Sequence, residues 1–294
     1  MINEVLKGSR LMRFERYDTT EAFADDVLEI LLENEAQNNH PINIALTKDE
    51  DSSSWLLGSI KDEKGSIVLV TARMSPFNMV LYETGNKPNK AATKLLSDEL
   101  KAMGYALPGV MAEQGLSQRF AEDYMGSSTK DGVACHSFAM SLMYLDAVNA
   151  IDRAPGYSRE LQEDDLFFAP YWARAFSEDA HVDTFDYPEM VEMLRKRLNK
   201  DVHYFWIDGH PVSQAVNGRN TINGAVVNSV YTPPNFRGSG YASSVVAELS
   251  QNLLERGNRF CCLFADTKNP VSCGIYRKIG YRDLCLFEEI KFPS

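Results

Sequence analysis

Long apolar runs are missing from this 294-residue sequence, in which no stretch approaches the ~20 residues of a membrane span. The first residues, MINEVLKGSRLMRFERYD, also lack an apolar core followed by a small-residue cleavage site. We therefore expect no signal peptide and no membrane partner, and we expect the protein to be cytoplasmic.

Cysteine and histidine are scarce and scattered. The five cysteines, Cys135, Cys261, Cys262, Cys273 and Cys285, are odd in number, and no two of them form a CxxC pair. The five histidines lack metal-ligand spacing. The sequence thus predicts no metal site and no disulfide framework, but buried thiols in a reducing cytoplasm. A catalytic Cys–His pair has no local pattern in its favour and stays open.

Basic residues are outnumbered, because 30 Lys and Arg face 41 Asp and Glu, for a net charge of −11. A general nucleic-acid binder normally shows a basic balance or patch, so we expect no nucleic-acid partner. The acidic balance favours cationic over anionic acceptors. Hydrophobic residues make up 44% and charged residues 24%, which is ordinary for a globular protein. The length suits about two domains.

The hydrophobic pattern divides the chain near its middle. In the first half it predicts helices over 19–35 and 89–104, a short strand and a helix within 107–126, and strands at 55–62, 66–75, 78–83 and 138–148. The turn residues of Ile151–Gly156 mark a boundary. The predicted domains are residues 1–150 and 151–294.

The second half repeats the order of the first. It predicts strands at 156–161, 221–232, 259–265 and 282–292, a hairpin at 203–218, and helices at 164–180, 186–200, 242–256 and 270–279. Each half reads helix, antiparallel strands, helix, strand, helix, strand, as a divergent duplication would. The predicted fold class is α/β, with two units that each hold a mixed, mostly antiparallel sheet flanked by helices.

The segment VYTPPNFRGSGYASSVVAELSQNLLERG places Gly238 and Gly240 between a strand and an amphipathic helix. Unpaired N–H groups and the positive end of the helix dipole make a helix N-terminus suited to an anion. Glycines there let a phosphate approach the backbone. On spacing alone, a plain flexible turn stays open. A dinucleotide-binding fold fits less well, because Pro233–Phe236 intervene between strand and glycines and too little chain follows Asp266.

The residues Arg237-Gly238-Ser239-Gly240-Tyr241-Ala242 match the R/Q-x-x-G-x-G/A loop of the GNAT superfamily of acyl-CoA-dependent N-acetyltransferases. Around this loop, VYTPPNFRGSGYASSVVAELSQ and LFADTKNPVSCGIYRKIGYR resemble the two cofactor-side motifs of that superfamily in order and spacing. The resemblance covers Ser158 to Phe292. The first half, which lacks the loop, resembles the degenerate GNAT-like domain of two-domain members.

The resemblance implies a role for each matching residue. The cofactor-side residues for acetyl-CoA would be Val230, Tyr231, Thr232, Arg237, Gly238, Ser239, Gly240, Tyr241, Ala242, Ser243 and Asn269. The pantetheine arm would add along the strand edge that ends at Thr232, and the pyrophosphate would lie on the loop N–H groups. Tyr276 would protonate the departing thiolate. Strand propensity for Tyr231 and Thr232, helix capping for Asn269 and core packing for Tyr276 stay open as plainer explanations.

The general base is where the sequence departs from the family pattern. Many members carry a carboxylate on the central strand, whereas residues 225–232 contain none, and Asn228 and Ser229 are the polar side chains before Tyr231. An amine must lose a proton before it attacks. That proton would leave through waters, through Asn228 or Ser229, or to a carboxylate elsewhere, such as Asp266.

The sequence therefore predicts an N-acetyltransferase that moves an acetyl or other small acyl group from acyl-CoA to an amine by direct attack in a ternary complex. No metal is expected. A non-catalytic acyl-CoA-binding or regulatory protein and a scaffold without cofactor affinity stay open. The acceptor, a small-molecule or peptide amine, stays open too, as do the acyl chain preference and a homodimer.

Overall fold

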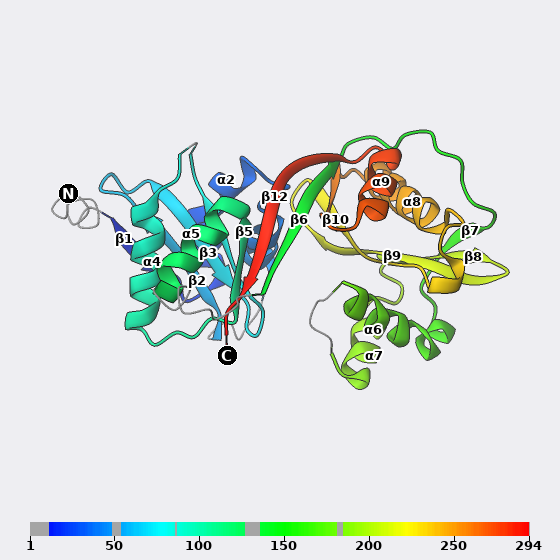
Figure 1. Ribbon diagram of the computed structural model, residues 1–294, viewed down its shortest axis with the longest axis horizontal. Helices are drawn as coiled ribbons and strands as arrows, with labels where there is room; N and C mark the ends of the chain where they lie inside the picture. The colour runs from blue at the N-terminus through cyan, green and yellow to red at the C-terminus, as the bar shows by residue number, and fades with distance from the viewer. Residues whose placement is uncertain (1–11, 49–53, 86, 127–135, 181–184, 294) are drawn as a thin grey trace. The chain divides into compact units, whose positions relative to one another are not determined.

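The computed structural model describes residues 12–48, 54–85, 87–126, 136–180 and 185–293. The chain forms two compact units (Figure 1). Unit 1 comprises Met1–Ser141 and Cys285–Ser294, and unit 2 comprises Leu142–Leu284. The predicted boundary fell between residues 150 and 151, whereas the contacts divide the chain between Ser141 and Leu142 and assign the last residues to unit 1.

Unit 1 is a mixed sheet with helices on both faces. Its elements are β1 (Arg13–Arg16), α2 (Thr20–Leu32), α3 (Asn39–Leu46), β2 (Leu56–Lys61), β3 (Ile67–Arg73), β4 (Met79–Glu83), α4 (Lys90–Ala102), β5 (Gly109–Glu113), α5 (Gln114–Met125) and most of β6 (His136–Leu145). The strand β12 (Arg282–Lys291) completes this sheet by pairing antiparallel with β5.

The core of unit 1 lies between the sheet and the pair α4 and α5. Leu96, Leu100 and Phe120 of these helices are fully buried against Leu56 and Val110 of the strands. On the other face, α2 and α3 contact β2, β3 and β4. The apolar spacing that predicts α2 and α4 from sequence is the spacing that buries them here.

Unit 2 contains β7 (Tyr157–Glu160), the 3₁₀ helix η3 (Glu163–Phe167), α6 (Ala169–Asp179), α7 (Tyr187–Arg195), β8 (His203–Asp208), β9 (His210–Asn220), β10 (Gly224–Tyr231), the 3₁₀ turn η4 (Pro234–Phe236), α8 (Tyr241–Glu255), β11 (Phe260–Asp266) and α9 (Pro270–Ile279). The strands are ordered β7-β8-β9-β10-β11, with β6 next to β11.

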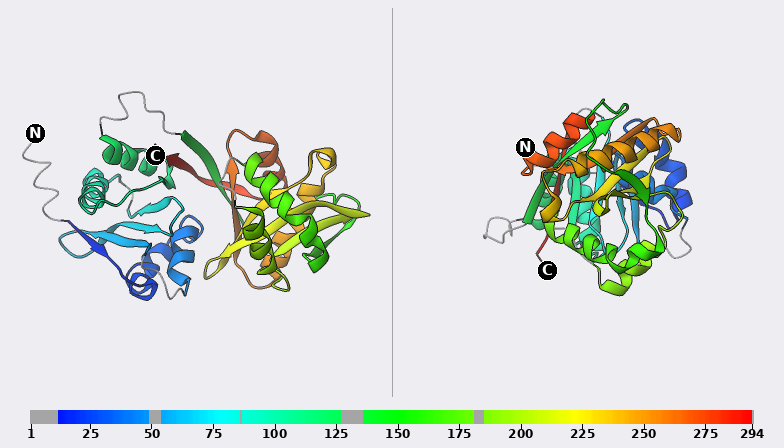
Figure 2. Two further views of the ribbon diagram at one scale, coloured as in Figure 1. Left: turned by 90° about the horizontal axis from the view of Figure 1, so that it is seen from below. Right: turned by 90° about the vertical axis from the view of Figure 1, so that its right-hand side faces the viewer.

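Strand β8 shows how the two faces of this sheet are covered. Tyr204 and Trp206 belong to the core cluster that includes α8 and α9, whereas Phe205 and Ile207 belong to a second cluster with η3, α6 and α7. Successive strand residues point to opposite faces, so helices must cover both. The ribbons show α8 and α9 on one face and α6 and α7 on the other (Figures 1 and 2).

Apart from the 3₁₀ elements η3 and η4, the described parts of both halves share one order of strands and α-helices: strand, two helices, three strands, helix, strand, helix, strand. The predicted α/β class is confirmed, and the two halves repeat one order as expected, although each has more elements at its start than the predicted order had. The last strand of each half contributes to both units, because Ser141 and Leu142 divide β6 and Leu284 and Cys285 divide β12.

Some local predictions were wrong. The single helix expected over 164–180 is η3 followed by α6, because Pro170 in the first turn of α6 starts a new helix rather than continuing one. Strand β1 and helix α3 were not predicted at all.

The predicted burial of the thiols is confirmed for three of the four cysteines within the described ranges. Cys261, Cys262 and Cys273 are buried, whereas Cys285 is half-buried. Cys135 and His181 lie outside the described residues. None of the helices in the described ranges combines the length and the hydropathy that a membrane crossing requires.

Candidate functional site

The central strands of unit 2 separate part-way along their length. β10 and β11 pair in parallel at Gly224, Ala225 and Val226, whose partners run from Phe260 to Cys262. Strand β10 continues to Tyr231, but the described ladder holds no further pair with β11. Among the described residues, the edge of β10 beyond Val226 therefore has no neighbouring strand on that side, and such an edge is where an extended ligand can add main-chain hydrogen bonds.

Asn228 and Ser229 lie on this separated part of β10. Asn228 Oδ1 is buried and has no hydrogen-bond partner among the described residues. Its carboxamide lies against Gly218 of β9, where a Cβ atom would come within 2.0 Å of Asn228 Nδ2. Ser229 has a φ of +49°, and the strand bulges beside it. These are the polar side chains that the sequence offered in place of a strand carboxylate.

The glycine loop lies between β10 and α8 and is exposed from Gly238 to Gly240. Both glycines adopt φ of +82°, a conformation that L residues rarely adopt. Gly240 is the N-cap of α8, and no side chain caps the helix. The residue that precedes the first N–H groups of α8, those of Tyr241, Ala242 and Ser243, therefore has no side chain that could cover them.

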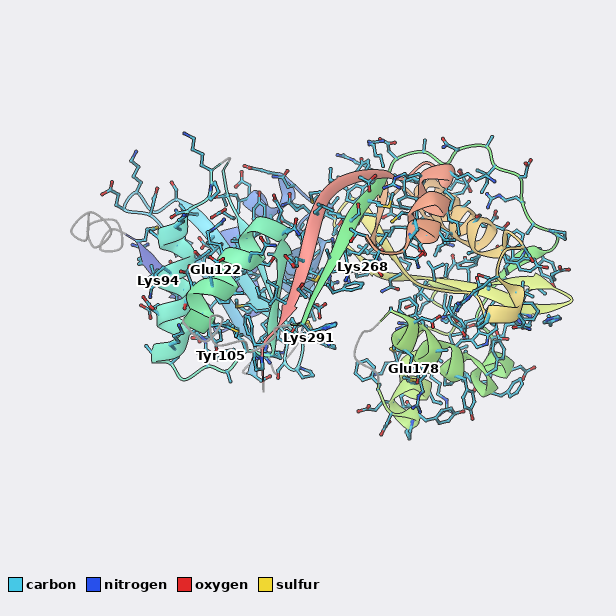
Figure 3. All side chains as sticks on the ribbon, in the orientation of Figure 1. Lys94, Tyr105, Glu122, Glu178, Lys268 and Lys291 are labelled. Carbon is cyan, nitrogen blue, oxygen red and sulfur yellow. The ribbon has the colours of Figure 1, made fainter. Side chains whose placement is uncertain are left out.

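Arg237 connects the loop to two neighbouring elements. Its Nε donates to the carbonyl oxygen of Thr232 at 2.9 Å, and its Nη2 donates to Asp179 Oδ2 of α6 at 2.6 Å. The adjacent Glu178, at the same end of α6 (Figure 3), pairs instead with Arg174 at 3.0 Å. Because Arg237 and Asp179 are about half exposed, their ion pair contributes little to stability.

Two further contacts hold the start of α8. Tyr241 Oη donates to Asp208 Oδ2 at 2.5 Å, and this hydrogen bond raises the pKa of Tyr241. Ser244 Oγ accepts the N–H of Ala154 at 2.8 Å and donates to the carbonyl oxygen of Gly240 at 3.0 Å. These hydrogen bonds fix the start of α8, while the glycine loop before it stays exposed.

The predicted pantetheine segment is held on its β9 side. Thr232 Oγ1 lies 2.8 Å from Ser213 Oγ, and Ser213 Oγ also donates to the carbonyl oxygen of Tyr231 at 3.2 Å. The Tyr231 ring is buried and meets Trp172 of α6 edge-on, with centroids 5.8 Å apart. Val230 packs against the α8 core cluster.

Asn269 and Asp266 both serve the turn before α9. Asn269 is the N-cap of α9, and its side chain accepts the N–H of Ser272 at 3.0 Å, which confirms the predicted capping. Asp266 Oδ1 accepts the N–H of Lys268 at 2.8 Å. This hydrogen bond stabilises the turn that precedes α9.

Tyr276 lies on α9 within the same core cluster against which Val230 and Tyr241 pack. It is 9% exposed, and its ring meets that of Tyr281 edge-on at 6.0 Å. Burial raises the pKa of Tyr276 above its ordinary value, and the neighbouring Cys273 adds to the shift. The phenol is therefore protonated at neutral pH.

The corresponding place in unit 1 is occupied by the chain itself. Within the described ranges, β4 and β5 pair in parallel at two positions, Met79 with Val110 and Val80 with Met111. At the end of β4, Glu83 Oε1 accepts the N–H of Asn89, the N-cap of α4, at 2.7 Å, and Glu83 Oε2 accepts Arg119 Nη2 at 2.6 Å. A carboxylate thus sits at the helix N-terminus where unit 2 has its exposed glycines.

The structure brings part of the predicted site together. Arg237 contacts Thr232, and Val230, Tyr241 and Tyr276 share one core cluster. Asn269 makes its described hydrogen bond within its own helix. Sequence reasoning missed the partners Asp179, Asp208 and Ser213, which lie far from the loop in sequence and carry no local signal. Among the described residues, no group of His, Cys, Asp and Glu could hold a metal ion.

Known proteins resemble this chain in both sequence pattern and fold. The family described as FR47-like protein matches residues 208–289. A search of the curated proteins finds no sequence match.

Solved structures match along almost the whole chain. An acetyltransferase of the GNAT family from Colwellia psychrerythraea is 11% identical, with 96% of this chain and 100% of that chain covered and a TM-score of 0.58. A GCN5-related N-acetyltransferase from Sphaerobacter thermophilus is 14% identical, with 95% of each chain covered and a TM-score of 0.61. A tandem GNAT protein from the clavulanic acid biosynthesis pathway is 11% identical, with 96% and 99% covered and a TM-score of 0.54. The chain therefore has the GNAT acetyltransferase fold, which confirms the resemblance at the level of fold.

Proposed function

We propose that unit 2 transfers an acetyl or other small acyl group from acyl-CoA to an amine, which attacks the thioester directly while both substrates are bound. The observation that carries the proposal is the separation of β10 from β11 beyond Val226, next to an exposed glycine loop at the start of α8. An extended thioester with a pyrophosphate would use two features that follow one another along the chain: a strand edge for its extended arm and a helix N-terminus for its pyrophosphate.

The residues present fit such a ligand. An ideal Cβ at Gly238 would meet nothing within 4 Å, and one at Gly240 would meet only Ala154 Cβ, at 3.7 Å. The backbone of the loop is therefore open to a phosphate. We assign the pyrophosphate to Arg237–Ser243 and the pantetheine arm to Val230–Thr232, and we keep Asn269 as a further cofactor-side residue.

The chain supplies positioning and polar groups for the transfer. Main-chain N–H groups of β10 would polarise the thioester carbonyl, and a fixed strand edge would hold it for attack. Tyr276, which burial keeps protonated, would give its proton to the departing sulfur. Because β10 offers no carboxylate, the amine proton would leave through water, through the polar side chains of Asn228 and Ser229, or to a carboxylate elsewhere, such as Asp266.

Unit 1 is proposed to bind no CoA. At the N-terminus of its helix α4, the N–H of the N-cap Asn89 already donates to the carboxylate of Glu83. Arg119 forms an ion pair with that carboxylate, and each of the two side chains is 14% exposed. A phosphate would have to displace this internal anion. We therefore propose that the reaction takes place in unit 2.

The test is release of free thiol from acetyl-CoA in the presence of a panel of small and peptide amines, with CoA affinity measured separately by calorimetry. We expect binding and amine-dependent thiol release. Binding without release for any amine would favour the runner-up, a non-catalytic acyl-CoA-binding or regulatory protein. Absence of binding would reject both.

A further inference from the structure

Strand β10 carries one extra residue where it bulges from β9. Asn228 pairs with Val216 and Tyr231 with Gln214, so Ser229 and Val230 oppose a single residue of β9. Ser229 has a φ of +49°, in the left-handed region that a serine rarely adopts. Such a conformation persists only when its surroundings hold it in place.

A side chain holds the bulge where the ladder does not. Gln214 Nε2 donates to the carbonyl oxygen of Ser229 at 3.2 Å, and Gln214 Oε1 lies 3.2 Å from His203 Nε2. The amide nitrogen faces a carbonyl, so the amide oxygen faces the imidazole, and His203 must donate through Nε2. The two hydrogen bonds, from His203 to Gln214 and from Gln214 to the Ser229 carbonyl, form a relay. This relay fixes both the rotamer of Gln214 and the tautomer of His203.

The relay is costly to maintain in the core. His203 and Gln214 are each 1% exposed, and His203 Nδ1 is buried with no hydrogen-bond partner in the part of the chain that the structure describes. Burial, together with the positive charge of Arg197, lowers the pKa of His203 to about 3, so the ring stays neutral and keeps its single donor on Nε2. An apolar pair would fill this space with no unpaired nitrogen, but it would leave Ser229 without its donor.

We propose that His203 and Gln214 are positioning residues for the acyl transfer: through the Ser229 carbonyl they set the direction of the β10 peptide groups that follow. These groups, from Val230 to Tyr231, belong to the strand edge that has no β11 neighbour. The inference rests on the proposed function, because the groups so directed are those assigned to the thioester. Removing the relay should disturb the reacting geometry more than the binding of CoA, whose phosphates lie on the loop.

The test compares wild-type protein with Gln214→Met, which keeps the length of the side chain and removes its donor. We expect the single-turnover rate of acyl transfer to fall about tenfold or more, as for loss of a polarising group, with the CoA dissociation constant within about threefold. The matched control is Ser97→Ala in unit 1, which also removes a buried side-chain donor to a main-chain carbonyl, that of Asp123, at 2.9 Å. It should change stability but not the rate.

A second variant, His203→Phe, keeps an aromatic ring next to Phe205, whose centroid lies 4.9 Å from that of His203, and removes the donor. Because His203 acts through Gln214, the double variant should be no slower than Gln214→Met alone. His203→Phe carries the test if Gln214→Met does not fold.

The outcomes separate the inference from the proposed function. Wild-type turnover with a normal rate in Gln214→Met, or an equal loss of rate and CoA affinity, would overturn the positioning role alone. Additive losses in the double variant would overturn the relay. A wild-type protein that binds CoA and transfers no acyl group would overturn the proposed function instead.

Discussion

Replacement of Gly240 by aspartate tests the assignment of the phosphate site. Gly240 is the N-cap of α8, with a φ of +82°, and a Cβ there would meet only Ala154 Cβ, at 3.7 Å. Space is therefore not limiting. The left-handed conformation costs an L residue about 1–2 kcal/mol, and asparagine and aspartate visit it more readily than most residues. Gly240→Asn and Gly240→Asp share that cost and differ in charge.

The magnitude follows from the distance between two anions. A carboxylate about 4 Å from a phosphate charge opposes it by ~1 kcal/mol at the dielectric constant of water and by ~4 kcal/mol at an effective value near 20. The exposed loop lies toward the first of these limits, and a pyrophosphate carries more than one charge. We expect the CoA dissociation constant of Gly240→Asp to rise at least about tenfold, or ~1.4 kcal/mol.

Calorimetry measures the effect, with a control at the opposite end of the same helix. Gly257 follows α8, has a φ of +97° and would place a Cβ in open space. Gly257→Asp should therefore lose stability as Gly240→Asp does, but keep its CoA affinity. Unchanged affinity in folded Gly240→Asp would refute the phosphate assignment, and an equal loss in Gly240→Asn would refute the electrostatic reason for it.

Three further outcomes are expected. Tyr276→Phe, which keeps the ring beside Tyr281, should bind CoA within a few fold and lose about tenfold or more in single-turnover rate; a normal rate would assign Tyr276 to the core. Titration should saturate at one CoA per chain, since Glu83 occupies the helix N-terminus of unit 1, and two bound molecules would contradict this. His203 has its pKa lowered from 6.5 to about 3, so its contribution to stability is present above pH 6.5 and is lost on acidification toward pH 3. Between pH 6.5 and pH 3, the free energy of unfolding should fall faster for wild type than for His203→Phe, by up to ~1.4 kcal/mol per pH unit. Denaturant titrations at several pH values measure this, and parallel curves for the two proteins would contradict a buried, neutral His203.

Local pattern was enough to predict much of the fold. The apolar spacing from Ala242 to Leu253 predicts α8 to within a residue of its start at Tyr241, and Asn269-Pro270 predicts the start of α9. Both signals are local, because a helix is defined by neighbours three and four residues apart. Strand β1 was missed because Arg13–Arg16 reads RFER, with a single apolar residue and no alternation to recognise.

Long-range pairing could not be predicted in the same way. The pattern of Arg282–Lys291 predicts a strand, but it does not say that Phe287–Lys291 pairs with β5 of unit 1. The same limit applies to the site. The glycine loop is a local motif, whereas the bond from Gln214 to Ser229 and the bond from Arg237 to Asp179 join residues that sequence spacing does not relate.

The most direct test of acyl transfer by unit 2 is to identify the product of a single turnover by mass spectrometry. Wild-type protein, acetyl-CoA and an amine that supports thiol release are mixed, and the amine, the CoA and the protein are each weighed. Direct attack in a ternary complex predicts one acetylated amine for each CoA released and no acetyl group on the protein. An acetylated protein that later acetylates the amine would contradict direct attack, and release of CoA without any acetylated amine would contradict acyl transfer itself.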